Sequence, residues 1–364
     1  MKFSIEKTAL SKALNIVSKG IMARGAIPIY SGIYVEASND GLIIKTTDLE
    51  ISIKTIVSAN VESLGKTIVP GKLFLDIIKS LPNGAVTFEQ NNNQANVLTT
   101  GAVFNLHTMS ADDFPEFPAT ATEKTVSIES QMFSQAVNRV VKAVSKDETR
   151  AILNGVCLTV KPEETSFVAT DSFRLSLYSI KTASQQSMNL IIPGAVIEEV
   201  SRLALENSDT LTIGEAKNQI IFSFGNTSFI SRKIEGNYPD YNKIIPDTSL
   251  TSTKIKTKDF LEAIKRVSIL AAEHTAIRIK IEDNVLTAFA NTQDVGEATA
   301  SLDCEQQGEA IEIGFNHQYI LDGLSSVSAE TCEFDTQTPG KPGVLKEADE
   351  KTSFIYLMMP VNLN

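Results

Sequence analysis

The chain has 364 residues, too many for one core of about 100–200 residues, so we expect two or three domains. Its hydrophobic content of 42% and charged content of 21% are ordinary for a folded protein and exclude global disorder. The formal net charge of −11 argues against a protein that holds nucleic acid simply by being basic overall.

The cysteines and histidines are too scattered to indicate a metal site or a disulfide framework. Cys157, Cys304 and Cys332 are odd in number, far apart and without C-x-x-C spacing, so we expect reduced, buried thiols. The three histidines also lie far from one another, and we interpret each as a surface or packing residue. The sequence therefore predicts no bound metal.

Motifs of known catalytic and cofactor sites are missing as well. The sequence has no phosphate-binding glycine loop, dinucleotide fingerprint, serine-hydrolase elbow or zinc-protease motif, so we predict no cofactor and no catalytic residue. Glu6, Lys7 and Lys12 interrupt the apolar stretch that a signal peptide needs, and no apolar run approaches the ~18–20 residues of a membrane span. We therefore expect a cytoplasmic protein with no membrane partner.

Along the chain, the first predicted elements are a short alternating strand and an amphipathic helix, and this pair occurs three times. Leu10, Phe133 and Phe260 hold equivalent positions, 123 and 127 residues apart, and apolar residues follow each at three, four and seven positions. The three copies span residues 3–17, 126–140 and 253–267.

A second strand and helix follow within each copy. Pro70-Gly71 leads into a helix predicted at 72–80, and Pro193-Gly194 leads into one at 195–205. The third copy keeps the switch from strand to helix without the proline, and its helix is predicted at 317–326. Alternating strands lie between the two helices of each copy, at 41–55, 166–180 and 284–302.

The boundaries between the copies repeat too. Phe114-Pro115 and Tyr238-Pro239 are 124 residues apart, and a linker containing proline and threonine follows each. We therefore predict three domains, at 1–120, 126–248 and 253–364. Each would have two helices and many short antiparallel strands, which is an α+β fold and not an alternating βαβ pattern.

Positive charge collects on the polar side of the first helix of each copy, if the helix is drawn at ~100° per residue. A basic face on a single helix would be explained by solubility. Basic faces at equivalent positions of repeated domains would lie on one side of the array, which favours contact with a polyanion that passes along it. The second helices mix cations with acids and add less. The predicted cations are Lys12 and Lys19, then Arg139, Lys142 and Lys146, and finally Lys265 and Arg266.

With these repeats the chain resembles, over its whole length, the bacterial sliding-clamp family, the beta subunit of DNA polymerase III. Besides the triplicated strand–helix starts, the motifs are residues 168–175 (VATDSFRL), 238–241 (YPDY), 313–316 (IGFN) with Tyr319, and 356–360 (YLMMP). The resemblance implies a head-to-tail homodimer of six similar domains that closes into a ring of the DNA-clamp fold around duplex DNA. Helices would line the hole and sheets would form the rim.

The resemblance also implies a non-catalytic role and a set of partners. A clamp loader would place the ring on DNA without regard to base sequence, and the ring would tether the replicative DNA polymerase catalytic subunit and so confer processivity. Other polymerases and repair proteins would bind through a short clamp-binding peptide. Two other classes stay open: a repeat-built peptide-binding scaffold that never encircles DNA, and an enzyme with clustered titratable groups between domains.

The peptide would bind in an apolar groove between the second and third domains, with Leu175, Ile244, Leu357 and Met359 as its pocket. A flexible methionine suits a site that accepts several peptides. The alternative interpretation is that these are ordinary core residues between two domains. The apolar residues at 358–361 favour the groove, because they must pack against another part of the chain to be shielded from water. The matching positions are Leu153, Thr170, Ser172, Phe173, Arg174, Leu175, Pro239, Lys243, Ile244, Asn316, Tyr319, Leu357, Met359, Pro360 and Val361.

Two further sets of residues follow from the resemblance. Arg24 and Arg150 match positions that face the duplex, whereas Ala151 and Ile152 stand where some members carry aromatic residues. The ring interface would pair the first domain with the third domain of the other copy. Its predicted residues are Phe104 and Leu106 on one side, and Ile269 and Leu270 on the other.

Overall fold

The computed structural model describes residues 1–22, 27–271, 276–293, 295–348 and 353–362. The chain forms two compact units, one of Met1–Ser130 with Arg202–Lys233 and one of Gln131–Ser201 with Ile234–Asn364. Within the described residues, no helix is long and apolar enough to cross a membrane.

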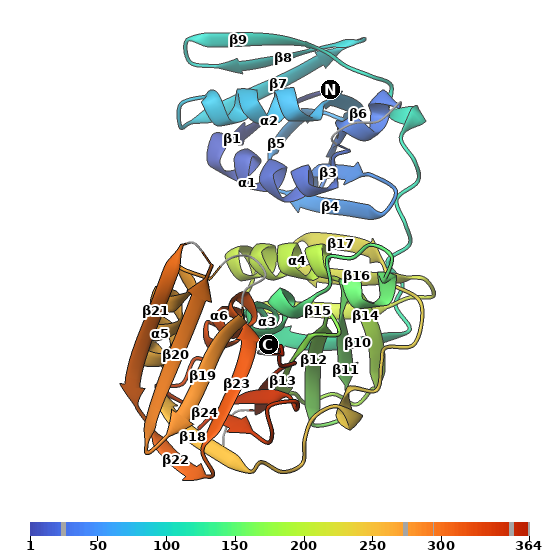
Figure 1. The fold of residues 1–364 in the computed structure, drawn as a ribbon. Helices are drawn as coiled ribbons and strands as arrows, with labels where there is room; N and C mark the ends of the chain where they lie inside the picture. Colours follow the sequence, from blue (N-terminus) through green and yellow to red (C-terminus); the bar gives the residue numbers. More distant parts are fainter. Residues whose placement is uncertain (23–26, 272–275, 294, 349–352, 363–364) are drawn as a thin grey trace. The chain divides into compact units, whose positions relative to one another are not determined.

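The first unit contains two antiparallel sheets (Figure 1). The five-stranded sheet has the order β5 (Asn60–Ser63), β1 (Lys2–Glu6), β7 (Ala85–Asn91), β8 (Gln94–Thr99) and β9 (Ala102–His107). The eight-stranded sheet has the order β10 (Lys124–Glu129), β15 (Thr210–Glu215), β16 (Gln219–Phe224), β17 (Thr227–Arg232), β4 (Ile51–Val57), β3 (Gly41–Thr47), β2 (Gly32–Ser38) and β6 (Gly65–Pro70). Strand β17 of the second repeat pairs with β4 of the first, and the buried hydroxyls of Thr55 and Thr227 lie 2.9 Å apart across that pair.

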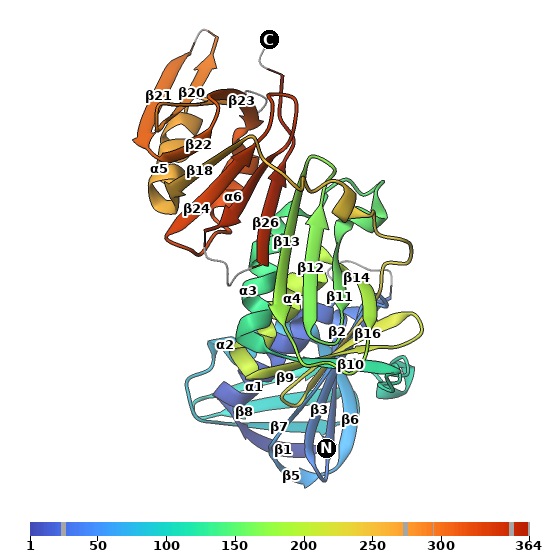
Figure 2. The same ribbon diagram turned by 90° about the horizontal axis from the view of Figure 1, so that it is seen from below.

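The second unit also contains two antiparallel sheets. One has the order β14 (Met188–Pro193), β11 (Gly155–Val160), β12 (Glu164–Thr170), β13 (Arg174–Lys181), β26 (Ser353–Met358), β25 (Gly343–Glu347), β24 (Thr331–Thr336), β18 (Thr251–Lys256) and β22 (Glu305–Gly308). The other has the order β21 (Gly296–Asp303), β20 (Val285–Thr292), β19 (Ala276–Glu282) and β23 (Ile311–Asn316). Figure 2 shows β26 beside β13, where the second and third repeats join into one sheet.

The predicted repeat of strands and helices is confirmed. Each copy begins with a strand that runs directly into a helix whose fourth residue, Leu10, Phe133 or Phe260, is buried. The second pair of strand and helix is present in each copy too. In the third copy, Asn316 replaces the proline as the residue before the helix. The helices are α1 (Lys7–Val17), α3 (Ser130–Val140) and α5 (Thr257–Ser268), then α2 (Gly71–Ser80), α4 (Gly194–Asn207) and α6 (His317–Leu324).

Apolar side chains hold each helix to its strands. In the third repeat, Phe260 of α5 packs 6.0 Å from Phe334 of β24, and Phe315 of β23 contacts the same ring at 5.9 Å. All three rings are buried, and such burial contributes about 1.5–3 kcal/mol for each side chain. The predicted α+β class is therefore confirmed, and the exact domain boundaries stay a prediction.

The cysteines differ in how far they are buried, which yields a testable prediction. Burial raises the pKa of the Cys332 thiol to about 11 and also raises the pKa of Cys157, whereas Cys304 is only half-buried. Because the thiolate is the reactive form, we expect Cys157 and Cys332 to resist a thiol reagent at about pH 8 until denaturant is added. Absorbance of the released chromophore measures this, and Cys304→Ser is the control that removes the native signal. Rapid labelling of Cys332 in the folded protein would contradict the assignment.

Candidate peptide groove and nucleic-acid interface

An apolar cluster covers one face of the nine-stranded sheet. Strand register places Leu175, Leu357 and Val344 side by side across β13, β26 and β25, and Cys157 beside Val168 on β11 and β12. Paired residues share a face, so these five buried side chains form one cluster. The partly buried residues packed against it are Leu177, Tyr238, Tyr241, Ile245 and Ile355.

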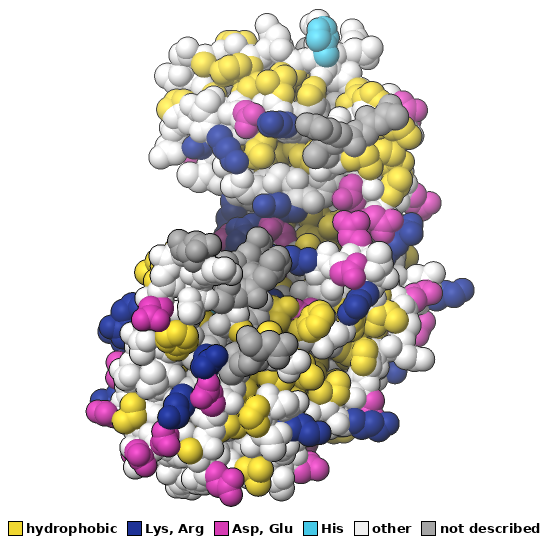
Figure 3. All heavy atoms as spheres, in the orientation of Figure 1, with side chains coloured by type: hydrophobic (Ala, Val, Ile, Leu, Met, Phe, Trp, Pro, Cys, Tyr) yellow, Lys and Arg dark blue, Asp and Glu magenta, His cyan; other side chains and the backbone are white. Residues whose placement is uncertain are grey.

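Exposed apolar side chains occur close in sequence to members of this cluster. Phe173, Ile244, Met359 and Val361 are all classed as exposed, with Phe173 at 55%. They come from three separate segments, yet Met359 N donates to the Phe173 carbonyl at 2.8 Å. Figure 3 shows hydrophobic side chains gathered over the region of β12, β13 and β23. Apolar surface of this kind, left in water, is typical of a binding site.

The turn before β13 presents Phe173 outward. Asp171 Oδ1 accepts hydrogen bonds from the backbone N–H groups of Phe173 and Arg174, both at 3.0 Å. Thr170 Oγ1 accepts from Ser172 N at 3.2 Å, and Ser172 has a φ of +78°, in the left-handed region. An aspartate that bonds its own following backbone stabilises such a turn.

Arg174, another predicted groove residue, has a buried side chain. Successive residues of a strand point to opposite faces, so Arg174 points away from Leu175. Its guanidinium is buried and contacts Asp171 at 3.0 Å, Asp322, and the Tyr356 hydroxyl at 3.3 Å. Burial alone lowers the pKa of Arg174, but Tyr356 and the two carboxylates outweigh it, so the pKa is raised. Arg174 therefore stays a predicted groove position, with a side chain that is bonded within the chain.

Two more predicted groove residues have local structural roles. Asn316 Oδ1 accepts from the backbone N–H groups of Gln318 and Tyr319, and so caps the N-terminus of α6. The Tyr319 ring lies against the Arg174 guanidinium, 4.5 Å from ring centroid to Cζ. Of the remaining predicted residues, Leu153, Thr170, Leu175 and Leu357 are buried, Pro360 is intermediate, and Ser172, Pro239 and Lys243 are exposed.

The prediction that Arg139 is an exposed cation is wrong. Arg139 is 8% exposed, its Nη2 atom lies 3.0 Å from Glu347 Oε1, and its guanidinium stacks on Tyr178 and Phe354 at 4.3 and 5.3 Å. Six residues after Phe133, it lies about 120° from the apolar face of the helix, at its flank and not opposite. Its partner, Glu347, is more than 200 residues away in sequence, so no local pattern could reveal the pair.

Helical periodicity also extends less far than expected. Helix α1 ends at Val17 and α3 at Val140, so Lys19 and Lys142 lie in short 3-10 turns and Lys146 in an irregular segment. The other predicted cations, Lys12, Lys19, Lys142, Lys146, Arg150, Lys265 and Arg266, are nonetheless exposed, whereas Arg24 lies outside the described residues.

Cations of the second helices join those of α1 within the first unit. A cavity of about 350 Å³ is lined by Lys12 and Lys19 and also by Lys79 of α2 and Arg202 of α4. Glu206, in the same lining, pairs with Arg202 at 2.7 Å. The sequence did not indicate this grouping, because the second helices mix acids with cations and the cavity joins residues of three helices that are far apart in the chain.

The residues predicted for the ring interface lie on or near sheet edges. Phe104 and Leu106 belong to β9, the last strand of the five-stranded sheet, and Leu106 is buried. Ile269, just after α5, is 80% exposed, and Leu270 is half-buried. Strand β21 is the last strand of the four-stranded sheet. Each of these two edge strands has one strand neighbour within the described chain.

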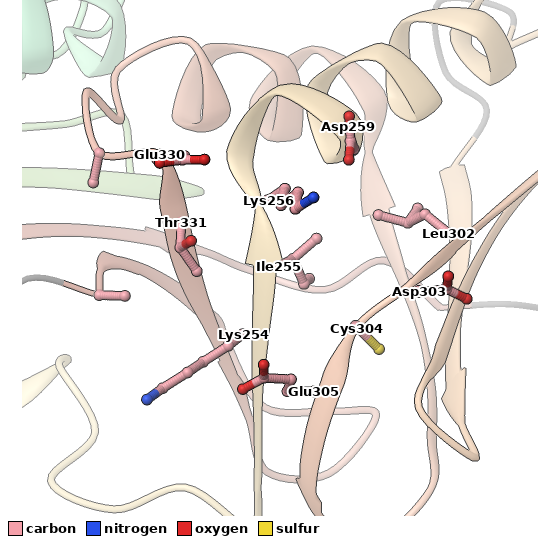
Figure 4. Close-up of a pocket in the computed structure, with 12 residues that line it drawn as sticks. Lys254, Ile255, Lys256, Asp259, Leu302, Asp303, Cys304, Glu305, Glu330 and Thr331 are labelled. Carbon is pink, nitrogen blue, oxygen red and sulfur yellow. The ribbon is translucent and has the colours of Figure 1, made fainter.

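A cavity of about 840 Å³ beside β18 and β22 bears on the enzyme alternative (Figure 4). The carboxylates of Asp259, Asp303 and Glu305 lie at separate edges of it and do not converge. Burial raises the pKa of the Cys304 thiol, and the charge of Asp303 raises it further, which disfavours the nucleophilic thiolate. The lining therefore offers no matched acid, base and nucleophile.

Comparison with known proteins decides the family. Models of the N-terminal, central and C-terminal domains of the DNA polymerase III beta subunit match residues 1–118, 127–240 and 242–362. The chain belongs to the DNA polymerase III beta subunit family. Three repeated α+β domains and the resemblance seen in the sequence are thereby confirmed.

Individual relatives of this family agree over the whole chain. The beta sliding clamp of Bacillus subtilis (strain 168) is 31% identical over 99% of both chains, and that of Staphylococcus aureus (strain Mu50) is 29% identical over 99% of both. The crystal structure of the DNA polymerase sliding clamp from Bacillus subtilis matches with a TM-score of 0.95 at 29% identity over both full chains. A sliding clamp from Pseudomonas aeruginosa bound to griselimycin matches with a TM-score of 0.94 at 28% identity, also over both full chains.

The buried ion pair of Arg139 and Glu347 yields a prediction on stability. Glu347→Gln leaves a buried guanidinium without its counter-charge, so we expect a loss of about 3–5 kcal/mol in the free energy of unfolding. Urea unfolding followed by circular dichroism measures it. The control is Glu312→Gln, which breaks an exposed ion pair with Arg278 and should cost at most about 1 kcal/mol. Equal, small losses in both variants would contradict a structural role for the buried pair.

Proposed function

We propose that this protein is a DNA sliding clamp, a non-catalytic processivity factor of DNA polymerase III. Two copies close head to tail into a ring around duplex DNA and tether the replicative polymerase in the cytoplasm. The observation that carries this function is the full-length match to the beta subunit family, whose relatives are named beta sliding clamps.

The distribution of charge supports encirclement better than tight binding. A ring holds DNA by topology, so weak and sequence-independent contacts with phosphates suffice and leave the ring free to slide. The exposed cations of α1, α5 and the segments after α3 supply such contacts in a chain whose total charge is −11. The DNA-facing set that we propose is Lys12, Lys19, Lys142, Lys146, Arg150, Lys265 and Arg266, with Arg24 outside the described residues.

If the ring holds DNA by encircling it, its retention should differ between circular and linear DNA. After loading, we expect the clamp to stay on nicked circular DNA and to leave once the circle is cut, because a ring slides off a free end. Gel filtration of labelled clamp with DNA before and after cutting measures retention. Loss at equal rates from circular and linear DNA would contradict encirclement.

A matched pair of surface variants tests whether retention needs the closed ring. Ile269→Asp places a charge on the proposed interface, so it should yield a monomer in native mass measurement and lose retention. Leu64→Asp alters a similarly exposed apolar residue, 58% exposed, outside that interface and should keep both properties. A wild-type monomer at micromolar concentration would favour the alternative, a peptide-binding scaffold that does not encircle DNA.

Partners are proposed to bind the groove above the apolar cluster through a short peptide. Phe173, Ile244, Met359 and Val361 provide its exposed apolar rim, and Leu175 and Leu357 provide its floor. Peptides of this kind would come from the replicative polymerase, the clamp loader, other polymerases and repair proteins. The thioether of Met359 is flexible and can adapt to related sequences.

Truncation of the proposed anchor should weaken peptide binding. We expect Met359→Ala to reduce affinity by about 1–3 kcal/mol, the range for removing a well-packed contact. Calorimetry with synthetic segments of the cognate polymerase catalytic subunit measures it. Val285→Ala is the control, because Val285 is 37% exposed like Met359 but lies on β20, outside the groove. Unchanged affinity of Met359→Ala would remove this residue from the site.

A further inference from the structure

An acidic surface continues the sheet face that carries the groove. Register places Asp335 of β24 beside Val344 of β25, which lies beside Leu357 of β26. Glu333 and Lys346 lie two residues along their strands from Asp335 and Val344, so they share this face. The acidic surface therefore begins where the apolar cluster ends, one strand beyond Val344.

A cavity of about 410 Å³ lies between these strands and the segment at residues 246–249. Its charged lining residues are Asp247, Glu333, Asp335 and Lys346, and its apolar lining includes Val344. Three carboxylates and one ammonium give this lining a net negative charge at neutral pH. Val344 belongs both to this cavity and to the apolar cluster, so the two adjoin at that residue.

One carboxylate of the cavity is incompletely satisfied. Asp335 is only 6% exposed, and its Oδ2 atom binds Lys346 Nζ at 2.6 Å, but its buried Oδ1 atom has no hydrogen-bond partner. Such an oxygen is rare in folded proteins, and a charged donor satisfies it best. Glu333 accepts a hydrogen bond from the Ser252 hydroxyl at 2.7 Å, and Asp247 is exposed.

The chemistry of the lining indicates which ligand fits. Phosphate groups of DNA would be repelled by the net negative charge. Among the described residues, no three acidic, histidine or cysteine side chains are grouped as metal ligands. A single organic cation fits this net negative lining, in which Asp335 has only one of its two carboxylate oxygens bonded. Such a cation reaches the cavity most directly as part of a peptide already seated in the adjoining groove.

We propose that this cavity binds a lysine or arginine side chain of the partner peptide, next to the apolar residue that fills the groove. The inference rests on the proposed function, because it takes the groove as the peptide site. It adds a charge preference that the apolar groove alone does not supply, and it assigns that preference to Asp247, Glu333 and Asp335.

Calorimetry with the full-length clamp tests the charge preference. The probe is the shortest polymerase segment that binds, synthesised with lysine, norleucine or glutamate in turn at each position flanking its apolar anchor. At one position we expect lysine to bind about five- to twentyfold more tightly than norleucine, and glutamate more weakly than either. The difference should shrink at about 0.5 M salt, as expected for a partly exposed ion pair.

Variants of the clamp assign the preference to the cavity. The double variant Asp247→Asn with Glu333→Gln should reduce the preference for lysine to within about twofold, as should Asp335→Asn. The double variant leaves the pair of Asp335 and Lys346 intact, so it serves if Asp335→Asn fails to fold. Asp303→Asn, in the cavity of Figure 4, is the control and should keep the preference.

The outcomes separate this inference from the proposed function. If the lysine, norleucine and glutamate peptides bind equally at every flanking position, the cationic site is wrong while the groove stands. A preference for lysine that persists in the double variant would place the site elsewhere and overturn the assignment. If no segment of the polymerase binds at all, the groove and the cationic site fall together.

Discussion

Backbone pairing between strands of different repeats is the constraint on which the rest of the structure depends. An open sheet edge exposes N–H and C=O groups that need partners, and the chain supplies them by joining β4 to β17 and β13 to β26. The second junction places Leu175 beside Leu357 and so forms the apolar cluster that we propose as the floor of the groove. The edges left at β9 and β21 are those that the proposed ring would pair between two copies.

Buried charge gives the second junction its specificity. Arg174 and Arg139 extend from the second repeat to Asp322 and Glu347 of the third, across or beside the strand pair. A buried ion pair contributes little net stability, but separating its partners is costly. The two pairs therefore disfavour other registers of β13 and β26, and Arg174 also holds the turn that presents Phe173 through Asp171.

Local patterns in the sequence predicted the helices and strands. The side chains that departed from prediction did so because of contacts with residues that are distant in sequence. The spacing of Leu10, Phe133 and Phe260 was sufficient to find three copies of one unit, because each helix buries its own apolar face. The burial of Arg139 and the unpaired Asp335 oxygen depend on residues that approach only in the folded chain. The apolar rim of the groove came from the family resemblance, and the acidic cavity beside it had no signal in the sequence.

After the buried Met358, backbone hydrogen bonds hold two residues whose side chains are exposed, Met359 and Val361. Met359 N bonds the Phe173 carbonyl, and Val361 N bonds the Gly314 carbonyl, both at 2.8 Å. Amide groups are common to every residue except proline, so the side chains at these two positions can be exchanged without moving the segment. If the proposed groove is the peptide site, its recognition can evolve separately from folding, and a library randomised at positions 359 and 361 would offer an engineer new peptide specificities on an unchanged scaffold.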